Sequence, residues 1–405
     1  MNHDKGQSYH QDEQQITGQG DELPRLSWAE VWARRLDRHG LGAPLQGARP
    51  AGIVRTICGA HAQVMSAAEL SIGLRIANSS IGSIRDALWN ERSLVKTYGP
   101  RGTVHILATQ DLPMWTGALR ATPYGQNADA RNELLTNEQA EELIAAIAHV
   151  LADAEMTAGE LTEALVEHVG PWAGDPVMDA FQSKWPRWRM IQSTAGVRGA
   201  FCFGPNRGRN VTYTSPRRWL PGFQPDDEMT ALAELVRRYL YAYGPATPSH
   251  FARWLAAPQS WAEDLFVSLS GQLEQVEIEG DQAWVAAGDI QASSEAPHGV
   301  RLLPYFDAYV VGCHPRERLF PGRAYERALA RGQAGNFPVL LIDGIAAGVW
   351  HQRRSGRKIE ITVESLEEIT RLQRGELNEQ VDRIGEILEG NARLTIGTVT
   401  AGPHA

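Results

Sequence analysis

Residues 157–169 read TAGELTEALVEHV, and residues 199–214 read GAFCFGPNRGRNVTYT. The first stretch starts with a Thr that has a Glu three positions after it, the spacing of a capping box, and Leu and Val then recur on one helical face. The second stretch has two β-rich runs around a turn of Gly, Asn and Arg, which is typical of a hairpin. Between them we expect a second helix from Asp179 to Ile191, interrupted near Pro186. Two helices followed by a hairpin indicate a winged helix-turn-helix unit, whose usual partner is a nucleic acid.

The same order of elements recurs further along the chain. The stretch YGPATPS (243–249) starts a predicted helix, a second helix follows from Trp261 to Leu269, and a hairpin runs from Leu273 to Val285. Because the turn of this hairpin, Glu279-Gly280-Asp281, is acidic, we expect this unit to be scaffold and not a phosphate contact.

A less regular version precedes both copies. It consists of two predicted helices, an apolar stretch and a hairpin, in the ranges Ser27–Arg38, Ile84–Trp89, Ala60–Ile76 and Leu94–Leu107. We call the hairpin of each unit its wing. Lys96 and Arg101 lie near the tip of the first wing, and Arg207 and Arg209 lie at the tip of the second. We predict that these four cations contact DNA phosphates.

The pattern changes after residue 292. Three strand-like runs follow, at 300–312, 337–351 and 358–363, and two helices are expected after them, Ser365–Arg374 and Leu377–Leu388. A small, mostly antiparallel β-barrel or curled sheet would close this part of the chain.

One turn in this last part carries four basic residues, which we call the basic tip: Arg353, Arg354, Arg357 and Lys358. A charge run of this kind is usually an exposed, solvated turn. Because the same chain also carries predicted wings, we favour a DNA contact for these four residues.

These patterns divide the 405 residues into a disordered N-terminal tail (1–22), three winged-helix units (23–125, 126–222 and 223–292) and a C-terminal β-barrel (293–405), an α+β fold. No apolar run is long enough to span a membrane or to act as a signal peptide, so we expect a cytoplasmic protein. The three cysteines, Cys58, Cys202 and Cys313, have neither a disulfide pattern nor zinc-ligand spacing. We treat them as core residues and expect no metal and no cofactor.

The net charge of −9 is an objection to a polyanion partner. Its distribution weakens the objection, because acidic residues gather in predicted exposed helices whereas basic residues gather at hairpin turns. Nearly all the basic residues are Arg, which suits bidentate phosphate contact, although codon composition alone can also produce an Arg-rich chain.

Four motifs occur in an order that is specific even though each is weak alone: RGTVH (101–105), YGPAT (243–247), LLPYFD (302–307) and IDGIAAGVW (342–350). From about Leu26 to Val399 the chain resembles the winged-helix DNA glycosylases of the AlkZ and YcaQ type. The resemblance implies winged helices bent into a C shape and a C-terminal β-barrel whose hairpin lies against the minor groove. It also implies excision of guanines alkylated at N7, including crosslinks and bulky natural-product adducts, in DNA repair or toxin self-resistance. The implied partner is double-stranded DNA, bound by a monomer.

The catalytic signature of that family is Gln, an apolar residue, then Gln or Asp, and the matching stretch here is GAHAQVMS (59–66). Gln63 keeps the second position as in the AlkZ-like branch, and His61 replaces the first Gln. The resemblance therefore assigns His61 and Gln63 to catalysis. A carboxamide can position a water, and a neutral imidazole can also accept its proton. The two side chains can share a water only outside regular helix, because positions i and i+2 of a helix lie ~200° apart.

Two other functions stay open. A transcription regulator would use the same winged helices to read sequence, usually as a dimer with polar recognition helices, whereas here these helices are rich in Trp and Ala. A non-catalytic lesion-binding or scaffold protein follows if His61 cannot replace Gln. From the residues alone, His61 is more simply a core histidine next to a polar Gln63.

Overall fold

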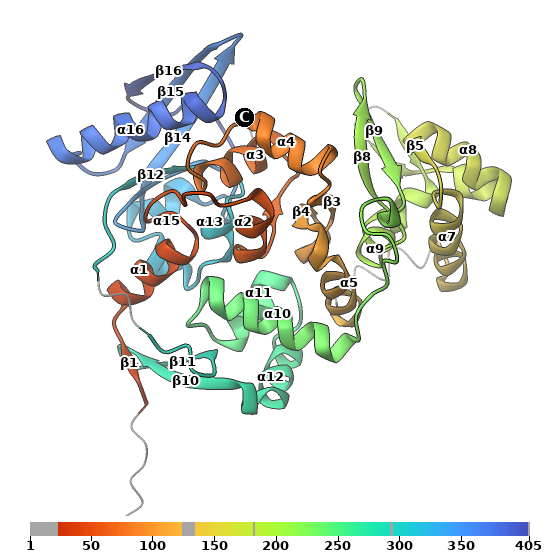
Figure 1. The fold of residues 1–405 in the computed structure, drawn as a ribbon, viewed down its shortest axis with the longest axis horizontal. Coiled ribbons are helices and arrows are strands. Elements are labelled where there is room, and N and C mark those ends of the chain that lie inside the picture. Colours follow the sequence, from red (N-terminus) through yellow and green to blue (C-terminus); the bar gives the residue numbers. More distant parts are fainter. Residues whose placement is uncertain (1–22, 124–133, 181–182, 292–294, 404–405) are drawn as a thin grey trace, which may run out of the picture.

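The computed structural model describes residues 23–123, 134–180, 183–291 and 295–403 (Figure 1). The predicted tail, residues 1–22, lies outside the described part of the chain. Helices and sheets are intermixed along the sequence, so the fold is α+β, as predicted. None of the described helices is long and apolar enough to cross a membrane.

The first part of the chain packs helices against short strands. Its elements are α1 (Trp28–Arg38), α2 (Pro50–Thr56), β2 (Ala60–His61), α3 (Met65–Leu74), α4 (Ile81–Trp89), β3 (Leu94–Tyr98), η1 (Pro100–Gly102), β4 (Val104–Ala108) and α5 (Leu112–Ala121). The predicted helix at Ser27 and the β3–β4 hairpin are confirmed. Every residue of α3 from Ala67 to Leu74 is buried, as expected for a helix that is packed on all sides.

The second part contains α7 (Asn137–Val150), β5 (Glu155–Thr157), α8 (Ala158–Val169), β6 (Pro176–Asp179), β7 (Lys184–Pro186), α9 (Gln192–Val197), β8 (Cys202–Arg207) and β9 (Asn210–Thr214). Thr157 and Glu160 form the predicted capping box at the start of α8. The β8–β9 hairpin is also confirmed.

The second helix predicted from Asp179 to Ile191 is wrong. This region forms the short hairpin β6–β7, and a 3-10 helix, η4 (Arg187–Ile191), then leads into α9. Helical structure begins only after Pro186, because proline lacks an N–H and disfavours helical backbone at the residue before it. The helix next to the second wing is therefore α9.

Strands of the first two parts form one six-stranded sheet in the order β2-β4-β3-β8-β9-β5. The two wings join through one pair of residues, Lys96 and Phe203. The strand β2, which carries His61, forms an edge of this sheet beside β4.

The third part contains α10 (Glu228–Tyr243), α11 (Pro248–Leu255), α12 (Gln259–Ser268), β10 (Leu273–Ile278) and β11 (Asp281–Ala286). The predicted helices and hairpin are confirmed, and β1 (Arg25–Leu26) pairs with β10. In the acidic turn, Glu279 accepts a hydrogen bond of 3.1 Å from the backbone amide of Trp28. This turn therefore holds the start of α1.

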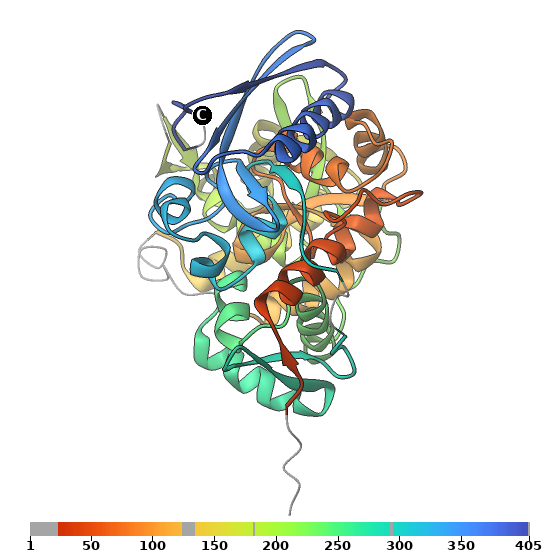
Figure 2. The ribbon, with the colours of Figure 1, turned by 90° about the vertical axis from the view of Figure 1, so that its left-hand side faces the viewer.

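The C-terminal part contains β12 (Val300–Leu303), α13 (Ala308–Gly312), α14 (Arg316–Leu319), α15 (Arg323–Ala328), β13 (Val339–Ile342), β14 (Ile345–Ser355), β15 (Lys358–Ser365), α16 (Arg371–Ile387) and β16 (Asn391–Ile396). Its five strands form a sheet in the order β12-β13-β14-β15-β16, which curls without joining its two edge strands (Figure 2). The predicted curled sheet is confirmed, and a closed barrel is wrong.

Two further predictions in this part are wrong. The run 300–312 is a strand only to Leu303, because Asp307 accepts a hydrogen bond from the amide of Tyr309 and caps α13. One helix, α16, replaces the two predicted C-terminal helices: it begins only at Arg371, and its buried residues recur at helical spacing from Leu377 onward.

A buried ion pair fixes α3 to the C-terminal part. Arg75, which follows α3, donates hydrogen bonds of 2.7 and 2.8 Å to Asp307, and Ser71 donates another of 2.7 Å. Both charged side chains are fully buried. Burial alone would raise the pKa of Asp307, but the Arg75 charge and these hydrogen bonds hold it below its usual value. Because removal of one partner leaves a buried charge, at a typical cost of about 3–5 kcal/mol, this pair locks Phe306 beside the segment that precedes α3.

The two arginine-bearing hairpins project from the same side of the molecule. Figure 1 shows β8–β9 and β14–β15 on either side of α3 and α4, and both still point upward after the turn to the view of Figure 2.

Candidate active site

His61 and Gln63 lie in a non-helical segment. His61 pairs with His105 across β2 and β4, and the amide of Ala62 donates a hydrogen bond of 2.7 Å to the carbonyl of Val104. The helix α3 begins only at Met65. Because this segment is not helical, the side chains of His61 and Gln63 can point the same way and share a water.

Aromatic rings enclose the imidazole of His61. The ring of Phe306 stacks on it with 4.4 Å between centroids and 28° between planes, and the ring of His105 meets it edge-on at 5.1 Å. His61 is only 7% exposed. Its Nδ1 is buried without a hydrogen-bond partner among the described residues.

This enclosure keeps both histidines uncharged. Burial, assisted by the positive charge of Arg101, lowers the pKa of His61 to about 3. Burial and the neighbouring His61 hold the pKa of His105 well below its usual value, and Nδ1 of His105 lies 2.9 Å from the carbonyl oxygen of Thr103. A neutral imidazole has one acceptor nitrogen and one donor, so at pH 7 His61 can accept a hydrogen bond from water. Its lowered pKa makes it a weak base, which takes a proton only from a strongly acidic donor such as a water that is bonding to an electron-poor carbon.

His61 and Gln63 line one cleft of about 510 Å³ between the first, third and C-terminal parts. Its lining also includes Arg101, Arg253, Trp254, Phe306, Arg316 and one carboxylate, that of Glu317. Gln63 is exposed, whereas His61 is buried at the wall. The cleft thus places a solvent-accessible carboxamide beside a shielded, neutral imidazole, a pair that can orient a water molecule and take its proton.

No group of three or more His, Cys, Asp or Glu residues in the described ranges could hold a metal ion. The three cysteines are free and buried, as expected of core residues.

The predicted cations of the first wing do not lie at an exposed tip. Lys96 lies in the middle of β3, half-buried, with its ammonium 5.3 Å from the ring centroid of Phe203. Arg101 lies in the β3–β4 turn with a left-handed φ of 61°, and it donates a hydrogen bond of 2.7 Å to the carbonyl of Trp254. The fold therefore brings Arg101 into the cleft with His61 and keeps Lys96 away from it.

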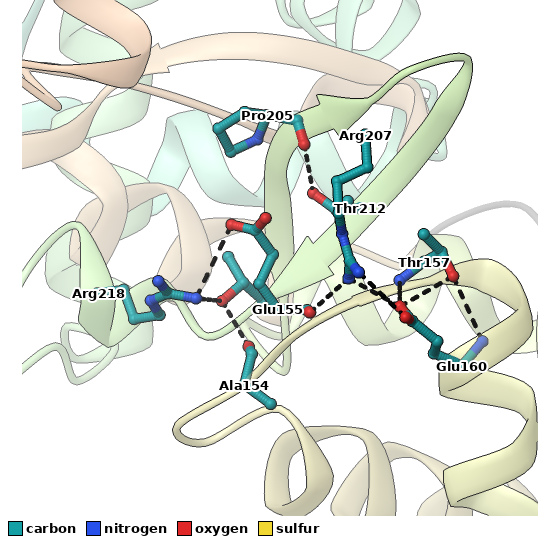
Figure 3. Close-up of polar contacts among 9 residues, drawn as sticks. Ala154, Glu155, Thr157, Glu160, Pro205, Arg207, Thr212 and Arg218 are labelled. Carbon is teal, nitrogen blue, oxygen red and sulfur yellow. Dashed lines mark hydrogen bonds and ion pairs between the residues drawn. The ribbon is translucent and has the colours of Figure 1, made fainter.

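Arg207 and Arg209 are exposed at the second wing, but Arg207 is engaged (Figure 3). Its guanidinium lies 2.7 Å from a carboxylate oxygen of Glu160 and donates a hydrogen bond of 2.6 Å to the carbonyl of Glu155. The carboxylate that caps α8 thus also neutralises Arg207.

The four residues of the basic tip are all exposed at the end of β14 and β15. Ser355 pairs with Lys358, so the turn has two residues, and Gly356 adopts a φ of +59° there. Lys358 forms an ion pair of 2.6 Å with Glu360. Within the described residues, Arg353 and Arg357 form no ion pair.

Sequence reasoning gave no role to Phe306, His105 or Arg253. The first two lie inside the motifs LLPYFD and RGTVH, which carry the family resemblance, and these motifs could have indicated a role for them. Arg253 lies on α11 without any such signal, and only the packing of α11 against η1 brings it to the cleft.

Residues 54–387 match the protein family described as DNA glycosylase AlkZ-like. An interstrand DNA cross-link repair glycosylase of Streptomyces sahachiroi is 29% identical over 337 residues, which cover 80% of this chain and 88% of that protein. The solved structure of Streptomyces sahachiroi DNA glycosylase AlkZ is similar with a TM-score of 0.76 and 25% sequence identity, over 92% of this chain and 100% of that chain. Since the family match spans most of the sequence, including the segment of His61 and Gln63, the chain belongs to the AlkZ-like DNA glycosylase family.

Proposed function

We propose that this protein hydrolyses the N-glycosidic bond of guanine alkylated at N7, including bulky or crosslinking natural-product adducts. The observation that carries the proposal is that His61 and Gln63, at the positions of the family's catalytic motif, line one cleft. The relative that repairs interstrand crosslinks supports the substrate class.

The chemistry fits these two groups. Alkylation at N7 makes the guanine cationic, so the base leaves without a strong acid, and the enzyme has mainly to present water to an oxocarbenium-like sugar. In our proposal Gln63 orients the water, and the neutral His61 accepts its proton as the C–O bond forms. No lysine lines the cleft among the described residues, so water, and not an amine, is the expected nucleophile, as in a monofunctional glycosylase.

We further propose that the three helix–hairpin units act as winged helices bent in a C shape around the duplex, with the basic tip in the minor groove. An open concave surface allows His61 to approach the sugar while a large adduct stays in the duplex, whereas flipping would require a pocket that admits the whole adduct. The protein would act as a monomer.

The test is excision of N7-alkylguanine from a duplex oligonucleotide, read as alkali-labile abasic sites. We expect Gln63→Ala to slow single-turnover excision by about 100-fold or more without weakening duplex binding, because a water-positioning group acts mainly in the transition state. His61→Gln should retain measurable activity, since it restores the usual residue of the motif. Gln282→Ala, an exposed glutamine on β11, is the matched control.

Wild-type rates for Gln63→Ala would remove the catalytic assignment. A wild-type protein that binds duplex DNA tightly but releases no base would favour the transcription regulator.

A further inference from the structure

A second pocket, of about 580 Å³, adjoins the cleft of His61. It is lined from α5, η1, α9 and the end of α11, and its polar lining residues are Arg101, Arg120, Thr122, Ser193, Thr194 and Arg198. No carboxylate lines it. In a chain with a net charge of −9, three arginines around one acid-free pocket mark a local site for an anion.

The loop η1 connects this pocket to the cleft. Arg101 of this loop lines both of them. The hydroxyl of Ser193 on α9 donates a hydrogen bond of 3.0 Å to the carbonyl of Gly102, and Arg101 donates to the carbonyl of Trp254 on α11. The loop is thereby held from both sides, so the two cavities keep a fixed relation.

The guanidinium groups are the donors that the pocket offers. The hydroxyls of Thr122 and Ser193 already donate to backbone carbonyls, at 2.8 and 3.0 Å. The side chain of Arg120 is exposed and forms no hydrogen bond or ion pair among the described residues. Its positive charge nevertheless acts on Glu141, whose pKa is lowered by the hydrogen bond from Arg198 and by the charges of Arg198 and Arg120. Arg198 pairs at 2.6 Å with Glu141, which lies outside the pocket lining. A guanidinium matches the oxygen geometry of a phosphate better than any other side chain.

We propose that this pocket binds a phosphodiester group of the DNA strand whose damaged nucleotide faces His61, and that Arg120 is the principal cation of the site. The pocket's position next to the cleft gives the strand a second fixed point beside the reacting sugar. Only the assignment of the strand rests on the proposed function, because phosphate binding itself does not require excision.

The test measures affinity for an undamaged duplex at several salt concentrations, so that catalysis does not enter. Arg120→Gln should weaken binding several-fold and flatten the slope of log affinity against log salt by ~0.9, the loss of one phosphate contact. Arg120→Lys should keep most of the slope, because the charge remains. Arg371→Gln, which removes another exposed arginine, at the start of α16, should change neither quantity.

A wild-type slope for Arg120→Gln, with the folded state verified by circular dichroism, would overturn the inference. A second arm replaces chloride by inorganic phosphate at constant ionic strength. If phosphate competes with DNA more strongly for the wild type than for Arg120→Gln, DNA and phosphate share this pocket, as proposed. If the wild type binds inorganic phosphate more tightly than Arg120→Gln but phosphate displaces DNA equally from both, the pocket is a site for free phosphate, and the strand contact is wrong. If the wild type excises no base but Arg120→Gln still weakens binding, the proposed function fails and this phosphate site stands.

Discussion

The cleft of His61 and the basic tip both gather nitrogen-bearing side chains, but they hold them in opposite states. In the cleft, His61 is enclosed by Phe306 and uncharged, and Arg101 is committed to a backbone carbonyl. At the tip, Arg353 and Arg357 are exposed and form no ion pair within the described residues. Exposed cations release counterions from DNA and provide affinity, whereas shielded neutral groups can exchange protons with a reacting water. From this difference we propose that binding and chemistry belong to different regions, so salt and pH should act on them separately.

The largest effect is expected at the basic tip. Replacing Arg353, Arg354, Arg357 and Lys358 together by Ala should flatten the slope of log affinity against log salt by up to about 3.6, because each lost phosphate contact removes ~0.9. Damaged and undamaged duplexes should be affected alike, since phosphate contacts carry no information on the base. Fluorescence anisotropy between 50 and 200 mM salt, about the range in which such slopes are measured, provides the readout. An unchanged slope would identify the tip as a solvated turn.

The protonation of His61 in the cleft, and with it the rate of excision, should depend on pH and not on salt. Phe306→Ala opens the face of His61 to water, so the pKa of His61 should rise from about 3 toward its ordinary value of 6.5. The wild-type His61 should show no titration between about pH 5 and 8 by NMR, whereas that of the variant should titrate within this range. Excision by the variant should then decline as the pH falls below the new pKa. Phe306→Tyr keeps the ring and should behave as the wild type; a titrating wild-type His61 would contradict the enclosure.

The lowered pKa of His61 also makes the free energy of unfolding depend on pH. Because the folded pKa of His61 lies below the unfolded value of 6.5, the unfolded chain binds more protons between these values. The stability that the neutral ring contributes is complete above about pH 6.5 and is lost as the pH falls toward 3. Phe306→Ala should reduce this acid sensitivity even if it lowers stability at pH 7, which chemical denaturation at two pH values would measure.

The smallest effect is expected at the second wing, where Arg207 is engaged by Glu160. Glu160→Gln keeps a capping residue at the start of α8 but removes the carboxylate charge, so Arg207 loses its ion pair and keeps only its hydrogen bond to the carbonyl of Glu155. Its positive charge is then available to DNA. The salt slope should steepen by up to ~0.9, and adding Arg207→Ala should cancel this change. No steepening would place the second wing outside the DNA path, and would leave the basic tip as the main contact.

Local features of the chain were accessible from its sequence. The capping box of Thr157 and Glu160 and the wings depend on residues a few positions apart, and they form as predicted. The helix predicted at 179–191 and the strand predicted at 300–312 were wrong because a proline, Pro186, and a helix-capping side chain, Asp307, determine the backbone there more strongly than the spacing of apolar residues does. Those residues change the backbone without changing the apolar pattern on which the prediction was based.

The sequence by itself determined most of the helices and hairpins, the position of His61 and Gln63 in a family motif, and the cluster of cations at the turn of β14 and β15. Only the tertiary structure decided which of those groups are charged and free. Glu160 neutralises Arg207 from 47 positions away, and Phe306 shields His61 from a different part of the fold. The physical reason is that solvation and ion pairing depend on distances in space, and residues distant in the chain set those distances only after the parts have packed.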